Sequence, residues 1–157
     1  MDRSDTLEVK LATPTVEEIQ KYRETWNTME NYVLQEESLN KLFFETYPQN
    51  KDIREILIKA SSLNDFYSTN IFSIFPVAKN ILRLDIDNRL QSGDETLVND
   101  ISRVEYSDGK VKNFYSFATK YCSHHYPNDY PIYDSYVEKV LIQYKKQDKF
   151  SEFTRKD

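Results

Sequence analysis

The sequence contains very little glycine. Only Gly93 and Gly109 occur in its 157 residues. Dinucleotide-binding loops, P-loops and multi-hairpin β-sandwiches all need glycine, either for turns with positive φ or where the backbone approaches a ligand closely. The chain lacks the turn chemistry of these classes, so we expect an all-α fold.

Cysteine is also scarce, and long apolar runs are missing. The single cysteine, Cys122, cannot form an internal disulfide, and on an aromatic helix face it is expected to be a small core residue. No apolar stretch is long enough to span a bilayer or to act as a signal peptide. These observations predict a cytoplasmic protein without membrane contact.

Positive charge is in the minority. The formal net charge is −5, which does not favour a nucleic-acid partner, so any DNA-binding face has to be local. The 12 Tyr, 9 Phe and 1 Trp supply large units of buriable surface, and the length fits one domain. We expect a flexible lead over residues 1–14 and a single helical domain over 15–157, which ends in a polar segment as a domain of a longer protein does.

Helical periodicity runs through most of the chain. Thr15 and Glu18 form a capping-box pattern, which predicts a helix that begins there and buries its apolar face. That face consists of Val16, Ile19, Tyr22, Trp26, Met29 and Val33. Further helices are expected over residues 38–47, 52–62, 77–84, 87–90, 95–104 and 111–122, and from Asp134 through Tyr144.

The most distinctive segment runs from Ser116 to Val137. It predicts a helix, a proline-bounded loop over 127–131, and a second helix that opens at Asp134. A carboxylate at a helix start lies beside unpaired backbone N–H groups and the positive end of the helix dipole. Asp134 is therefore expected to be ionised at neutral pH.

This arrangement, with Pro131-Ile132-Tyr133-Asp134 following an apolar helix, resembles the helix-hairpin-helix DNA glycosylase superfamily, in particular its bacterial 8-oxoguanine-glycosylase-like branch. The resemblance implies a compact orthogonal multi-helix domain that binds double-stranded DNA without a metal or another cofactor. It implies that Asp134 stabilises positive charge on the deoxyribose as a damaged base leaves, or orients the nucleophile.

Other site residues follow from the same resemblance. The family hairpin would correspond to residues 108–113, where Gly109, Lys110, Lys112 and Asn113 are the candidate DNA contacts. The hairpin lysine that forms a Schiff base in some members falls near Tyr115, so it is not assigned, and Lys120 is the first basic candidate for catalysis. The walls of a pocket for a flipped base would come from Phe66, Tyr67, Tyr115, Tyr121 and Tyr126.

Each of these residues also has an ordinary interpretation. Asp134 is equally a simple helix cap, Lys120 a lysine whose stem reaches solvent, and His124 and His125 surface or capping residues rather than metal ligands. The alternative functions are a non-catalytic helical module that binds protein or nucleic acid, and a defence-associated or regulatory domain that recognises an unstacked nucleotide. A glycosylase predicts that Lys110, Lys112 and Lys120 converge beside Asp134 at a cleft.

Overall fold

The computed structural model describes residues 10–153. Most of the expected lead, residues 1–9, lies outside the described residues. The chain divides into a central unit, Met29–Asp134, and a terminal unit formed by the residues up to Thr28 and those from Ser135 on. A single domain over 15–157 stays a prediction.

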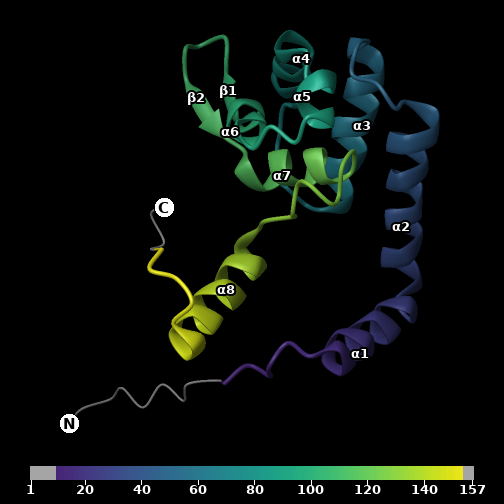
Figure 1. The fold of residues 1–157 in the computed structure, drawn as a ribbon. Coiled ribbons are helices and arrows are strands. Elements are labelled where there is room, and N and C mark those ends of the chain that lie inside the picture. Colours follow the sequence, from purple (N-terminus) through teal and green to yellow (C-terminus); the bar gives the residue numbers. More distant parts are fainter. Residues whose placement is uncertain (1–9, 154–157) are drawn as a thin grey trace. The chain divides into compact units, whose positions relative to one another are not determined.

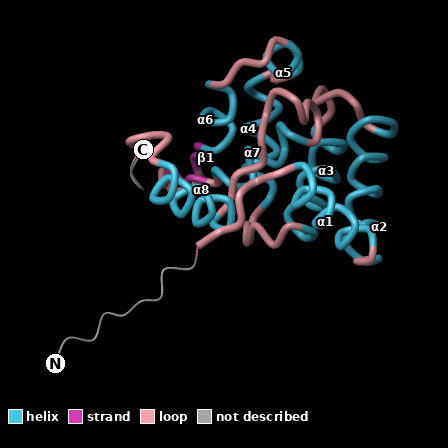
Figure 2. Tube along the Cα trace, turned by 60° about the horizontal axis from the view of Figure 1, so that its bottom comes forward, coloured by secondary structure: helices cyan, strands magenta, loops and turns pink. Residues whose placement is uncertain are grey.

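The fold is mostly helical, as expected (Figures 1 and 2). In chain order the central unit contains α2 (Glu30–Asn40), a π-helix η1 (Lys41–Thr46), α3 (Ile53–Phe66), α4 (Ile74–Leu84), α5 (Asp87–Gln91), α6 (Thr96–Ser102), β1 (Arg103–Glu105), β2 (Val111–Asn113) and α7 (Tyr115–Ser123). The terminal unit contains α1 (Val16–Asn27) and α8 (Ser135–Asp148).

The core of the central unit lies between α3, α4, α6 and α7. Its fully buried side chains include Phe43, Ile56, Ile81 and Tyr121. In α7 every residue from Phe117 onward is buried, and Cys122 is a free thiol with no exposed surface, which confirms it as a core residue. The helix therefore carries its polar residues into the interior, where each of them needs a partner.

The β1–β2 hairpin corrects the expectation that helices fill residues 95–104 and 111–122. Arg103 pairs with Asn113 and Glu105 with Val111 in an antiparallel register. The turn between the strands contains Gly109 at φ +76, a conformation that favours glycine. The helical period in this region was carried by α6 and α7 alone, and the strands between them are too short for a period of their own.

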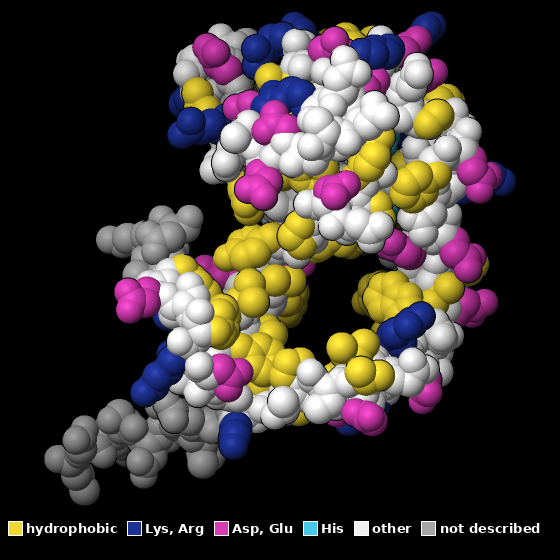
Figure 3. Space-filling view, viewed as in Figure 1, with side chains coloured by type: hydrophobic (Ala, Val, Ile, Leu, Met, Phe, Trp, Pro, Cys, Tyr) yellow, Lys and Arg dark blue, Asp and Glu magenta, His cyan; other side chains and the backbone are white. Residues whose placement is uncertain are grey.

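The first helix forms as predicted, but its apolar face is not buried. Thr15 accepts a hydrogen bond from the Glu18 backbone N–H at 3.2 Å, as a capping residue does. Val16 is 78% exposed and Ile19 is 55% exposed, and Figure 3 shows hydrophobic side chains at the surface over α1. The helix also ends at Asn27, because the Thr28 hydroxyl and backbone N–H both bond to the Thr25 carbonyl. The expected single buried stripe from Val16 to Val33 is wrong.

No helix within residues 10–153 has the length and apolar character that crossing a membrane requires.

The contrast between α1 and α3 gives a matched prediction. We expect Ile56→Ala to lower the free energy of unfolding by about 2–5 kcal/mol, because Ile56 has no exposed surface and its truncation leaves a cavity. We expect Ile19→Ala to change it by less than about 0.5 kcal/mol. Urea denaturation of both variants measures this difference. Equal losses would mean that α1 buries its apolar face in solution.

Candidate functional site

Lys120 and Asp134, the two residues that the sequence singles out for catalysis, form an ion pair. The Lys120 Nζ atom lies 3.2 Å from Asp134 Oδ2 and 2.8 Å from the Ser116 hydroxyl. Lys120 is 2% exposed, so the expectation of a lysine stem that reaches solvent is wrong. The Asp134 side chain is 28% exposed, and solvent reaches the pair from the carboxylate side. Asp134 directly precedes α8, as the proline-bounded loop predicts.

The ring of Tyr67 lies next to the Lys120 ammonium, with 5.3 Å between Nζ and the ring centroid. The Tyr67 hydroxyl donates to Glu36 Oε2 at 3.0 Å and lies 3.1 Å from His124 Nε2. Burial and the negative charge of Glu36 raise the pKa of Tyr67, so the phenol stays protonated. The neutral Tyr67 ring therefore lies against the lysine, while Glu36 and His124 fix its hydroxyl group.

The five residues expected to wall a base pocket have different surroundings. Tyr121 has no exposed surface, and its ring meets Phe43 edge to face with centroids 5.1 Å apart. Tyr115 is 40% exposed and packs against Tyr133. Phe66 and Tyr67 are half-buried beside the core. Tyr126 lines a polar pocket on another side of α7.

The candidate DNA-contacting residues lie in the β1–β2 hairpin. Gly109 is at its turn, Asn113 is exposed on β2, and Figure 1 shows the turn pointing away from α7. The Lys110 ammonium pairs with Asp108 at 2.9 Å and its side chain is 77% exposed. The Lys112 ammonium lies 4.8 Å from the centroid of the Tyr106 ring. The expected convergence of Lys110 and Lys112 with the buried Lys120 is therefore not found in the described residues.

Sequence reasoning missed a second buried lysine, Lys59. Its Nζ donates to the carbonyls of Tyr47 and Gln49 at 2.9 and 2.8 Å and to Asn50 Oδ1 at 2.7 Å. Burial lowers its pKa to about 8. The sequence position of Lys59 could have predicted its burial. Lys59 follows Ile56 by one helical turn and so lies on the buried stripe of α3.

Asn50 connects this lysine to α5 and to the end of α7. Its Oδ1 also accepts a 2.6 Å hydrogen bond from the Tyr121 hydroxyl. Its backbone N–H and its Nδ2 both donate to Asp87, and Nδ2 lies 3.2 Å from His125 Nε2. His124 and His125 are 4% and 8% exposed, so a surface placement is wrong for both. His124 is the C-cap residue of α7, as the capping alternative predicts. Both rings are buried as parts of hydrogen-bonded clusters.

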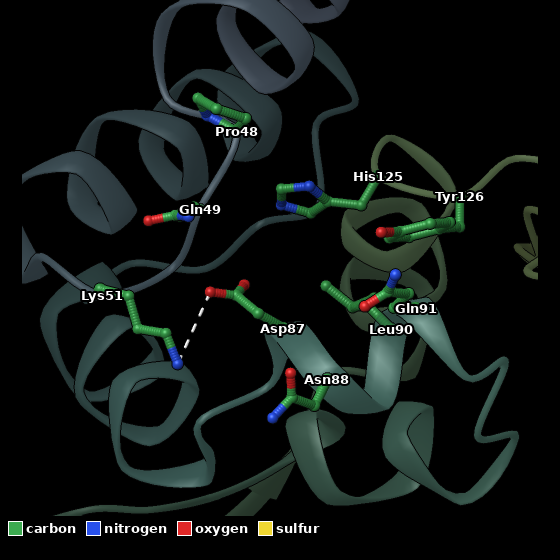
Figure 4. Close-up of a pocket in the computed structure, with 9 residues that line it drawn as sticks. All are labelled: Pro48, Gln49, Lys51, Asp87, Asn88, Leu90, Gln91, His125 and Tyr126. Atoms are coloured by element: carbon green, nitrogen blue, oxygen red, sulfur yellow. Dashed lines mark ion pairs between the residues drawn. The ribbon is translucent and has the colours of Figure 1, made fainter.

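A pocket of about 310 Å³ lies beside this network (Figure 4). The loop after η1, helix α5 and the residues that follow α7 each contribute to its lining. Within residues 10–153, no group of three His, Cys, Asp or Glu side chains is arranged to hold a metal ion. Two buried polar clusters of the central unit include residues of α7 or of the segment that follows it, one around Lys120 and one around Asn50.

These features define a class, a small and mostly helical domain with two buried polar clusters that meet on α7. Residues 18–129 match HI_0787_N, a family of N-terminal domains, and the chain belongs to this family. The matched range includes Lys120 and ends before Asp134.

A relative from Haemophilus influenzae, described as an uncharacterized protein, is 57% identical over 106 residues. The similar region covers 67% of this chain and 52% of the relative, so the chain spans about half the length of the curated relative it matches. No solved structure matches the chain.

The buried His125 makes folding stability depend on pH. Burial and the positive charge of Lys59 lower its pKa from 6.5 to about 3. Its stabilising contribution is fully present above pH 6.5 and is lost as the pH falls toward 3, because the unfolded chain binds a proton that the folded chain does not. We expect a loss of up to about 1.4 kcal/mol per pH unit in this window. Urea denaturation between about pH 4 and pH 7 measures the slope.

His125→Gln is the matched variant, because glutamine keeps an acceptor for Asn50 Nδ2 and does not titrate. We expect a shallower pH dependence for this variant than for the native protein. His124 and all carboxylates are present in both proteins, so their titration does not account for the difference. Equal slopes would show that His125 titrates alike in the folded and unfolded chains.

Proposed function

We propose that the protein is a DNA-binding protein of base-excision glycosylase ancestry and that it removes a damaged base by N-glycosidic cleavage at Lys120 and Asp134. One observation carries this proposal. A buried ammonium and a partly exposed carboxylate lie 3.2 Å apart, and the carboxylate is at the position that the resemblance implies for catalysis. Double-stranded DNA is the proposed partner and the cytoplasm the proposed location.

The pair fits the chemistry of base removal. A fixed carboxylate in a water-poor site stabilises the positive charge that develops on the deoxyribose as the glycosidic bond breaks. In a lyase-type reaction, Asp134 first takes a proton from Lys120, and the neutral amine forms a bond to C1′ as the bond between C1′ and the base breaks. The base leaves with the bonding electrons and takes the proton from Asp134, which restores the carboxylate beside the positively charged sugar–amine adduct. Ser116 and the Tyr67 ring hold the lysine in place throughout.

A second candidate function is a helical interaction module that kept the scaffold and lost the activity. The surroundings of the hairpin lysines favour this candidate, since Lys110 pairs with Asp108 and Lys112 lies over Tyr106. The net charge of −5 also favours the interaction module, because it weakens the attraction of the protein to DNA phosphates. The two candidates differ in whether base release depends on Asp134.

Base release from double-stranded oligonucleotides tests the proposal directly. The native chain, Asp134→Asn and Lys120→Gln are incubated with duplexes that carry 8-oxoguanine, uracil, hypoxanthine or an abasic site. We expect Asp134→Asn to lower the rate of base release by about 10²–10³-fold, as the loss of a preorganised charge does. We expect Lys120→Gln to abolish borohydride trapping of the protein on DNA.

Asp65→Asn is the matched control, because it removes an exposed carboxylate of the central unit outside both clusters. It should leave the rate unchanged, and circular dichroism should show all variants folded. The same background rate from the native protein and Asp134→Asn on every lesion would eliminate the enzyme and leave the interaction module.

A further inference from the structure

The pocket beside Asn50 is a second candidate site, separate from the ion pair of Lys120 and Asp134, neither of which lines it. Figure 4 shows Gln49 and Lys51 on one side of it, His125 and Tyr126 on the other, and α5 between them. Its volume of about 310 Å³ is at the small end of the range for ligand pockets, which is about 300–1,000 Å³. A single ring system with a small substituent fits this volume.

The hydrogen bonds of Asn50 fix the tautomer of His125. Asn50 Oδ1 accepts from Lys59 and Tyr121, so the side-chain nitrogen of the amide is the atom that faces Asp87 and His125. An amide nitrogen only donates, so Nε2 of His125 is the acceptor and Nδ1 carries the proton. Burial keeps the pKa of His125 near 3, so the ring is neutral.

His125 Nδ1–H is consequently a donor that the network does not use. Within residues 10–153, no fully buried side-chain nitrogen or oxygen lacks a hydrogen-bond partner, and no partner is found for this atom. The atom therefore keeps some exposed surface, and His125 is one of the residues that line the pocket. Its Nδ1–H group is thus a neutral, preorganised donor on a pocket-lining residue.

The charged side chains around the pocket are paired with one another. Lys51 forms ion pairs with Asp85 and Asp87, and Asp87 also accepts hydrogen bonds from Asn50. The three charged residues carry one more negative than positive charge, which disfavours an anionic ligand. The remaining polar groups are mostly uncharged.

Those uncharged groups have the chemistry that recognises a flat heterocycle. Gln49, Asn88 and Gln91 line the pocket, and each side chain ends in an amide, which has a donor and an acceptor side by side. Figure 4 shows the Gln91 amide next to Tyr126. Asparagine and glutamine pair in this way with the donor and acceptor edge of a base. Tyr126 adds an aromatic face on which a planar ring stacks.

We propose that this pocket binds one uncharged, planar heterocycle with amide-type donors and acceptors on its edge, the chemical class of a nucleobase. His125 Nδ1–H and the amides of Gln49, Asn88 and Gln91 contact the edge of the ring, and Tyr126 contacts its face. The site is independent of the reaction at Lys120, because binding requires none of the residues of that pair.

Saturation-transfer NMR of the full chain with adenosine, guanosine, cytidine and thymidine tests this site, and titration gives the dissociation constant. We expect saturation transfer to the ring protons of at least one nucleoside. Gln91→Ala should weaken binding about fivefold, the factor that corresponds to one net hydrogen bond of about 1 kcal/mol. Tyr126→Leu should weaken it about tenfold through the loss of stacking. Asn99→Ala, an exposed amide on α6 that does not line the pocket, is the control.

Competition with a single-stranded oligonucleotide identifies the source of the ring. Displacement of the nucleoside would show that the pocket takes a base from a strand, and its absence would show a site for free nucleosides. No saturation transfer to any nucleoside at millimolar concentration would overturn the proposal. So would displacement by inorganic phosphate alone, or affinities that neither Gln91→Ala nor Tyr126→Leu changes. Asp134→Asn should bind like the native protein, which separates this result from any result on base release.

Discussion

The hydrogen bonds of the Asn50 side chain are the constraint on which the central unit depends. They join the loop after η1 to Lys59 of α3, to Asp87 of α5 and to Tyr121 and His125 at the end of α7. Replacing such a group would leave several buried partners unsatisfied, and each of these costs about 1–3 kcal/mol. Because every member of the network has partners, it specifies one relative arrangement of these helices where apolar packing alone tolerates several.

Helix α7 connects the Asn50 network to the ion pair of Lys120 and Asp134. Tyr121 and His125 face the Asn50 network, whereas Lys120 and His124 face Tyr67. The two buried lysines are stabilised in different ways. Lys59 is surrounded by neutral oxygen acceptors and its pKa is about 8, whereas Lys120 has a carboxylate partner. A single helix thus places one lysine opposite a counter-ion and helps to hold another without direct charge compensation.

The sequence was sufficient to predict the mostly helical fold, the cap at Thr15 and the segment that places Lys120 and Asp134, because all three depend on local spacing. It was insufficient for the exposed face of α1, since periodicity reports an amphipathic helix and not what covers it. It also failed for Lys59, His124 and His125, because polar residues enter a core only where distant segments supply partners. Asn50 is the clearest case, because its four side-chain partners come from α3, from α5 and from the end of α7.

The burial of Cys122 has a consequence for the chemistry of the whole chain. The thiol has no exposed surface, and burial raises its pKa to about 12, so the reactive thiolate is essentially absent in the folded protein. Alkylating reagents and oxidants therefore meet sulfur only when α7 leaves the core. Because the sequence has a single cysteine, the rate of thiol labelling measures how often α7, the helix that contributes to both polar clusters, opens locally.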